Sequence, residues 1–242
     1  MTSDEAIALE GVVVVLSAHL DDGVFSLGAA MSRAVRAGSV VTVLTVLAGD
    51  PRSTAGPSTW DAACGYASAA AAASGRRLED DEACRHLGVD PVWLPFDDAS
   101  YGRPRSDDEI WDAIESRLGN ADIVMAPGFP LSHPDHAWLA GLVLARSTRS
   151  RLGLYLEQPY AYHYDGPIST RVPAPIDGSI EPLRWRSIRV ARRDRRAKRR
   201  AVGAYRSQLP SLSDDRFLVA RLARYERSRG GETIAWIERR AV

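Results

Sequence analysis

The chain has 242 residues, of which 45% are hydrophobic and 26% charged, a composition typical of a globular protein that buries a substantial core. It carries 31 basic and 31 acidic residues, so no net charge attracts it to nucleic acid or to a membrane. Cys64 and Cys84 are too few for a disulfide framework or a cysteine-ligated zinc cage. Any metal would therefore use mainly histidine and carboxylate ligands.

The N-terminal residues, MTSDEAIALEG, are acidic and lack the basic start and apolar centre of a signal peptide. No apolar run approaches the roughly 20 residues that span a bilayer. We therefore expect a cytoplasmic protein that has no membrane partner.

The first predicted element is a strand over residues 12–16, whose valine-rich run is typical of a strand buried on both faces. Three titratable residues, His19, Asp21 and Asp22, follow it directly. Apolar residues then recur at helical spacing until Gly38, a suitable helix stop. The polar cluster is thus predicted in a strand-to-helix turn, at the edge where open α/β sheets bind ligands.

The next part of the chain continues the alternation of strands and helices. A second strand is predicted over residues 40–47, and an alanine-rich region, forming one helix or two, ends at Gly88. A third strand is predicted over residues 91–96. Ser106 and Glu109 form a capping box that opens the next helix.

A second polar cluster follows the fourth predicted strand, residues 122–127. The loop after this strand contains HPDH at residues 133–136, and another helix and a fifth strand over 152–158 come next. Strands that alternate with helices at these intervals predict a parallel α/β sheet with right-handed crossovers.

The pattern changes after the fifth strand. Residues 159–183 are rich in proline and glycine and predict a long ordered loop or a short insertion that faces the substrate. Helices are predicted over 191–208 and 217–227, and TIAWIE predicts a closing strand. No repeat or change in composition divides the chain, so we expect residues 1–242 to form a single domain.

The two clusters together offer the donors of a catalytic metal site. Catalytic zinc commonly takes three protein ligands of the His/His/carboxylate kind and leaves one position open. Each cluster alone has a simpler interpretation, as a helix cap with solvated acids or as a turn in which Pro134 opens a helix. Because both follow strands of one predicted sheet, we favour a shared site over two coincidental caps.

The pairing of SAHLDD with HPDH resembles the PIG-L or LmbE-like family of zinc-dependent N-deacetylases. The segments RRLEDDEACRHLGV and KRRAVGAYRSQ are also similar to family segments. The resemblance implies a Rossmann-like fold, an open and mostly parallel sheet with helices on both faces. It also implies hydrolysis of N-acyl groups, mostly acetyl groups of amino sugars. Leu20 and Gly23 replace a proline and a glutamate of the first family motif, which weakens any inference about the substrate.

Carried over position by position, the resemblance assigns the metal ligands to His19, Asp22 and His136. It implies Zn²⁺ as the cofactor, and since two histidines and one carboxylate also suit Fe²⁺, both metals stay open.

The same resemblance implies three catalytic residues. Asp21 matches the general base, His133 matches the group that stabilises or protonates the tetrahedral intermediate, and Asp135 matches the partner that orients His133. The chemistry is consistent, because a carboxylate next to a ligand takes the proton of a water molecule and a charged imidazole faces an oxyanion.

We therefore expect a zinc-dependent deacetylase that removes an N-acetyl or short N-acyl group from an amino sugar or glycoconjugate, with natural-product biosynthesis as one setting. One alternative is an amidase that acts on a thiol–sugar conjugate. Another is a non-catalytic, arginine-rich nucleic-acid-binding protein, because residues 184–200 carry ten basic side chains and one acid, Asp194. We favour a solvated helix face for this segment and expect no nucleic-acid partner. The sequence leaves homo-oligomerisation open.

Overall fold

The valine-rich run forms β1 (Val12–Ser17) at the centre of the sheet. It pairs in parallel with β2 (Val40–Thr45) on one side and with β4 (Ile123–Phe129) on the other. Alternate side chains of β1 belong to two separate hydrophobic cores, one on each face of the sheet. Two buried faces explain why this strand is apolar throughout rather than at every second position.

The computed structural model describes residues 8–102, 106–146, 149–172, 179–213 and 217–240. Within these ranges seven strands form one sheet in the order β3-β2-β1-β4-β5-β7-β6. The pairs from β3 to β5 are parallel, whereas β7 is antiparallel to both of its neighbours. The remaining strands are β3 (Asp90–Trp93), β5 (Arg151–Leu156), β6 (Arg186–Ile188) and β7 (Glu232–Trp236). The predicted α/β class with a mostly parallel sheet is confirmed.

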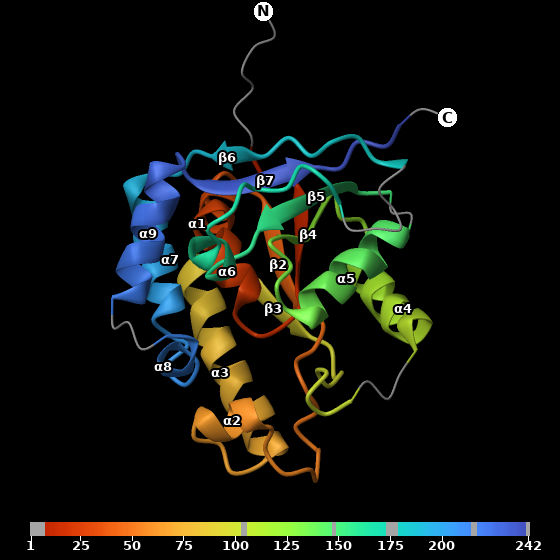
Figure 1. Cartoon of the computed structure of the whole chain (residues 1–242), viewed down its shortest axis with the longest axis vertical. Coiled ribbons are helices and arrows are strands. Elements are labelled where there is room, and N and C mark those ends of the chain that lie inside the picture. The colour runs from red at the N-terminus through yellow and green to blue at the C-terminus, as the bar shows by residue number, and fades with distance from the viewer. Residues whose placement is uncertain (1–7, 103–105, 147–148, 173–178, 214–216, 241–242) are drawn as a thin grey trace, which may run out of the picture.

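Helices cover both faces of the sheet, as Figure 1 shows. One core contains residues of α1 (Asp22–Arg36), α3 (Ala69–Leu87), α7 (Arg192–Val202) and α9 (Leu218–Ser228). The other contains residues of α4 (Asp107–Leu118) and α5 (Pro134–Ala145). Three short helices are α2 (Thr59–Ala63), α6 (Tyr160–His163) and α8 (Leu209–Leu212). Among the described residues, no helix has the length and apolar character needed to cross a bilayer.

The strand order places the two polar clusters side by side. The chain runs from β1 outward to β2 and β3, then returns to β4 and continues to β5 on the other side. The direction of winding therefore reverses between β1 and β4, and ligands of open α/β sheets bind at the carboxyl ends of the strands at such a point. Both clusters follow these two strands.

Several predicted boundaries differ from the structure. The helix predicted over 191–208 ends at Val202, because residues 203–208 turn to contact α3. The alanine-rich region forms one continuous helix, α3. Strand β6 was not expected from the sequence, and it has only three residues. Within the predicted loop 159–183, residues 160–163 form α6, and residues 173–178 lie outside the described residues.

Candidate metal centre and active site

Local hydrogen bonds fix the turn that carries the first cluster. The hydroxyl of Ser17 donates to the carbonyl of His19 at 2.7 Å and accepts from the N–H of Gly23 at 2.9 Å. The N–H of His19 donates to Oδ2 of Asp22 at 2.8 Å. Asp22 is the first residue of α1, where the free N–H groups and the helix dipole favour a carboxylate. The turn thus holds two of the predicted ligands against each other.

The second cluster opens α5. His133 is the N-cap, and its Nδ1 accepts the N–H of Asp135 at 3.2 Å. Pro134 occupies the first turn, where its fixed φ and missing N–H suit a helix start. His136 follows in the same turn and is fully buried. The helix start therefore directs the second cluster toward the first.

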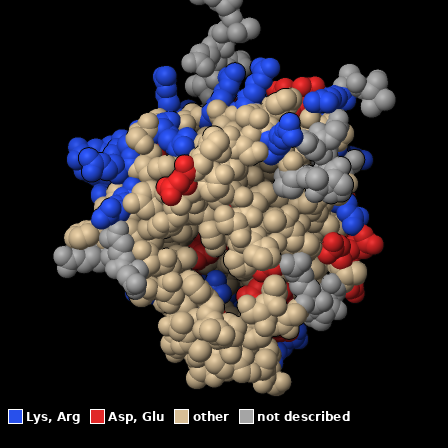
Figure 2. Space-filling view, viewed as in Figure 1, with Lys and Arg blue, Asp and Glu red and all other residues tan. Residues whose placement is uncertain are grey.

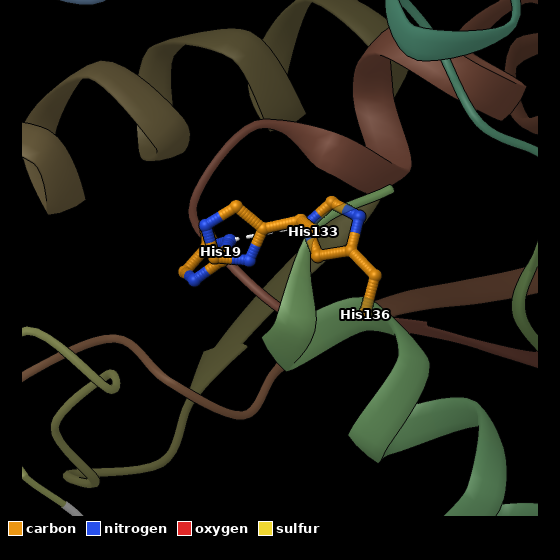
Figure 3. Close-up of side chains that lie close together, drawn as sticks. All are labelled: His19, His133 and His136. Carbon is orange, nitrogen blue, oxygen red and sulfur yellow. Dashed lines mark hydrogen bonds between the residues drawn. The ribbon is translucent and has the colours of Figure 1, made fainter. Parts of the chain in front are cut away.

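Three donor atoms of the predicted ligands form a compact triangle. Nε2 of His136 lies 3.2 Å from Nδ1 of His19 and 3.1 Å from Oδ2 of Asp22. The third side, from Nδ1 of His19 to Oδ2 of Asp22, is 3.4 Å. Figure 3 shows the side chains of His19, His133 and His136 gathered together, with the short contact between His19 and His136 dashed.

The spacing and chemistry of these donors fit a divalent metal. Tetrahedral ligands about 2.0–2.1 Å from zinc lie about 3.3–3.4 Å from one another, close to the separations in the triangle. The surroundings also favour positive charge. Burial lowers the pKa of His136, but Asp22 and Glu157 outweigh burial and raise this pKa to about 11. Burial also lowers the pKa of His19, and Asp135 and Asp22 raise it to about 9. A cation is therefore stabilised at this point.

A second donor set overlaps the first. Ring nitrogens of His19, His133 and His136 all lie within 4.8 Å of one another. This triangle is wider than the one that includes Asp22, and Nδ1 of His133 already accepts a backbone N–H. We therefore favour Asp22 over His133 as the third donor.

Buried carboxylates contact the outer nitrogens of both histidines. Nε2 of His19 lies 3.1 Å from Oδ2 of Asp135, and Nδ1 of His136 contacts Oε2 of Glu157. The family resemblance implied that Asp135 orients His133, but Oδ2 of Asp135 lies 3.9 Å from Nδ1 of His133, farther than it lies from Nε2 of His19. In this structure the Asp135 carboxylate is therefore closer to the first ligand than to His133. Metal-bound histidines typically have such carboxylate partners.

Asp21 precedes Asp22 in the chain and lines the same cavity as His19 and Asp22. Burial and the neighbouring charge of Asp22 raise the pKa of Asp21 to about 7, and Arg76 offsets part of this effect. A general base works best when its pKa is near the pH at which the enzyme operates. The surroundings of Asp21 thus suit proton transfer, whereas Asp22 has a pKa well below its usual range, chiefly because His136 outweighs the effect of burial.

His133 lies at the cavity and is half-buried. Because its Nδ1 accepts a hydrogen bond, the proton of the neutral ring is on Nε2, which is then available as a donor. Burial and the nearby rings of His19 and His136 lower the pKa of His133. We expected a charged imidazole at His133 from the sequence, whereas these surroundings favour a neutral ring that donates from Nε2.

The site opens into a cavity of about 410 Å³, within the range of small-molecule pockets. In Figure 2 the face toward the viewer is hollowed, and acidic and basic side chains are visible in the hollow. The cavity is lined by the polar residues of the metal site, by other polar side chains such as Arg76 and Gln208, and by apolar side chains. The apolar lining comes from several elements and includes Phe25, Trp60, Pro134, Pro159, Tyr160 and Leu212.

Several residues of the site were not singled out from the sequence. Arg76, on α3, lines the cavity and lies 3.7 Å from the carboxylate of Asp61. Trp60 donates its indole N–H to Oε1 of Gln208 at 2.8 Å, which fixes one wall. Glu157 follows β5, and the only signal for it was a polar pair, Glu-Gln, at the carboxyl end of a predicted strand.

Comparison with protein families gives one match. A family model described as PIG-L, GlcNAc-PI de-N-acetylase, matches residues 14–147, which is more than half of the chain. The matched region contains both polar clusters. A comparison with curated protein sequences found no match.

Solved structures of deacetylases are similar over nearly the whole chain. The zinc-inhibited form of teicoplanin deacetylase is 26% identical with a TM-score of 0.82, and the match covers 95% of this chain and 98% of that one. A deacetylase of the pseudoaglycone of an antimicrobial reagent is 28% identical with a TM-score of 0.79, at the same coverage. The N,N'-diacetylchitobiose deacetylase of Pyrococcus horikoshii is 19% identical with a TM-score of 0.58, over 95% of this chain and 83% of that one, and shows the shared fold.

Proposed function

The chain belongs to the PIG-L family of de-N-acetylases, and we propose that it is a metal-dependent hydrolase that removes an N-acetyl group from an amino sugar of a glycoconjugate. The observation that carries this proposal is the triangle of donor atoms from His19, Asp22 and His136, next to a cavity that Asp21 also lines. These four residues bring a metal site and a base to one end of a cavity.

The residues of the chain hold the metal and supply the acid–base chemistry. When bound, Zn²⁺ or Fe²⁺ at His19, Asp22 and His136 polarises the amide carbonyl and lowers the pKa of a water molecule to about 7. Asp21 accepts the proton of the attacking water and later passes it to the leaving amine. His133 donates a hydrogen bond from Nε2 to the oxygen that becomes negative.

The shape of the cavity and the two similar deacetylases support a glycoconjugate as substrate. The deacetylases at 26% and 28% identity act on teicoplanin and on an antibiotic pseudoaglycone. The apolar walls around Trp60, Tyr160 and Leu212 suit the apolar parts of such a molecule. We extend the proposal to an N-acetylated amino sugar within a natural product. A cytoplasmic location, expected from the sequence, is part of the same proposal.

The proposal is tested by metal content and by product. Elemental analysis of the purified protein is expected to give about one zinc or iron per chain, since the two possible ligand sets among the described residues share His19 and His136 and can hold only one ion. The protein is then incubated with N-acetylglucosamine, its aryl and glycopeptide glycosides, and an acylated thiol–sugar conjugate. We expect acetate from the glycosides, lost on chelation and restored by metal.

Two results would contradict this function. A protein that binds neither metal, and gains no activity when either is added, is not a metal-dependent hydrolase. Exclusive cleavage of the thiol–sugar conjugate would favour the alternative amidase.

A further inference from the structure

Glu157 follows β5 at the same edge of the sheet as the two polar clusters, and it is only 1% exposed. Its carboxylate contacts the second cluster at two separate points. Oε2 contacts Nδ1 of His136, and Oε1 accepts the backbone N–H of Leu131 at 3.0 Å. Both oxygens are thus engaged, one by a ring and one by the loop that leads into α5.

The first contact bears on how His136 binds metal. The Nε2 atom of His136 lies in the donor triangle, so it must present a lone pair there. A carboxylate at Nδ1 holds the ring proton on that nitrogen and keeps Nε2 free as a ligand. The orientation of the ring is fixed by the same contact.

The second contact bears on the loop before His133. Leu131 has φ 56°, a left-handed conformation that is uncommon for a residue other than glycine. Because the N–H of Leu131 is bonded to Glu157, the carboxylate stabilises this backbone turn two residues before His133. One side chain thereby holds the segments that carry both histidines of the second cluster.

The backbone of Glu157 is itself fixed on both sides. Its N–H donates to the carbonyl of Phe129 at 2.7 Å, and its carbonyl accepts the N–H of Ala161 at 2.8 Å. The carboxylate therefore projects from a rigid position between β4 and α6. Rigid support of this kind holds metal ligands in the geometry that they need.

We propose that Glu157 is a positioning residue that sets the tautomer and orientation of His136 and shapes the loop that places His133. The inference rests on the proposed metal-dependent function. It assigns Glu157 a role in metal affinity and in catalysis without contact between Glu157 and the reacting atoms.

The test compares Glu157→Gln with the wild-type protein. The amide oxygen of Gln accepts one of the two hydrogen bonds, but its NH₂ group cannot accept the other. Metal-free protein is titrated with Zn²⁺ in competition with a chromogenic chelator. We expect the zinc affinity of Glu157→Gln to fall by about 10- to 100-fold, the usual effect of losing such a partner. We also expect kcat to fall at saturating zinc, because His133 is no longer held.

Asp80→Asn is the matched control. Asp80 is also 1% exposed, and its carboxylate also accepts two hydrogen bonds, from Trp93 Nε1 and Tyr205 OH, both at 2.7 Å. It does not line the cavity of about 410 Å³. Asp80→Asn is therefore expected to lower the melting temperature while zinc affinity stays unchanged.

A second test uses only the wild-type protein and therefore does not depend on the folding of a variant. Nitrogen-15 NMR of the histidine rings in zinc-loaded protein is expected to show the proton of His136 on Nδ1. A proton on Nε2, unchanged zinc affinity in Glu157→Gln, or an equal loss of affinity in Asp80→Asn would each overturn the inference and leave the proposed function intact. A wild-type protein that binds no metal would overturn both.

Discussion

Asp21 and Asp22 are neighbours in sequence, but their carboxyl groups have different surroundings. Asp22 lies against the rings of His19 and His136, which keep it ionised. Asp21 faces the cavity, where burial and the charge of Asp22 raise its pKa to about 7. A difference of this kind separates a metal ligand from a base even when the two residue types are identical.

His133 provides a test of the ligand assignment at the level of one residue. Because we place His133 outside the donor triangle, His133→Ala is expected to keep its metal. The loss of one donor to the developing oxyanion is expected to lower kcat by about 10²- to 10³-fold. Metal analysis and turnover of the same preparation check both points. If the variant lost its metal together with its activity, the set of three histidines would be the ligands instead.

At the scale of elements, the first five strands along the chain could be predicted because each lies in a largely apolar run between turn signals. The two clusters could be predicted because they are local motifs at the ends of β1 and β4. Strand β6 and the end of α7 could not be predicted. The three residues of β6 form a strand because they pair with β7, and α7 ends where residues 203–208 turn to contact α3. Glu157 was missed for the same reason. Its role depends on contacts with residues 21 and 26 positions earlier in the chain.

Helix α7 joins the rest of the fold through a buried charge network. Nζ of Lys198 contacts Glu226 on α9 and Glu232 on β7, both through a carboxylate oxygen. Glu232 also accepts the N–H groups of Ala29 and Ala30, at 2.9 and 2.6 Å, and so links α1 to the same network. One buried lysine is therefore paired with two buried carboxylates.

Because two buried carboxylates share one lysine, we expect the stability of the fold to depend on pH. Burial raises the pKa of Glu226 to about 7 from an ordinary value of 4.5, and Lys198 offsets part of the effect. The protonated form thus favours the folded state, and its contribution is complete below pH 4.5 and lost as the pH rises through about 7. The free energy of unfolding of the wild-type protein should fall relative to that of Glu226→Gln across this window, by up to about 3 kcal/mol.

Chemical denaturation between pH 4 and 9 measures the difference between the two proteins. Glu82→Gln is a suitable control. The hydrogen bond from Arg206 lowers the pKa of Glu82 from its ordinary value of 4.5, so protonation of Glu82 changes stability below the window in which Glu226 titrates. A constant difference between wild-type protein and Glu226→Gln over the whole range would show that Glu226 does not titrate in this window.

At the scale of the whole molecule, the zero net charge conceals an uneven distribution. Figure 2 shows basic side chains gathered beside α9 and along the edge at β6 and β7, and a group of acidic side chains on the opposite side, near α4. One face of α7 packs into the core, where Asp194 binds Arg36 through two hydrogen bonds of 2.8 and 2.9 Å. The other face exposes five arginines, Arg192, Arg193, Arg196, Arg199 and Arg200. The predicted solvated helix face is present.

We expect this basic face to bind nucleic acid no more tightly than any basic surface does. Gel-shift titration with duplex DNA at physiological salt should give a dissociation constant no tighter than the non-specific range of about 10⁻⁴ to 10⁻⁶ M. Tighter binding, lost when the five exposed arginines of α7 are replaced, would favour the alternative of a nucleic-acid-binding protein.

The most direct test of the proposed function is a parallel measurement of metal content and turnover in Asp21→Asn and Asp22→Asn. Asp22→Asn is expected to lose metal and activity together, with partial recovery in excess metal. Asp21→Asn is expected to keep its metal and fold while its rate falls by about 10²- to 10⁴-fold, because an amide cannot accept the proton. Loss of metal from Asp21→Asn with retention in Asp22→Asn would reverse the two roles. Full activity in both variants would contradict a catalytic function for this turn.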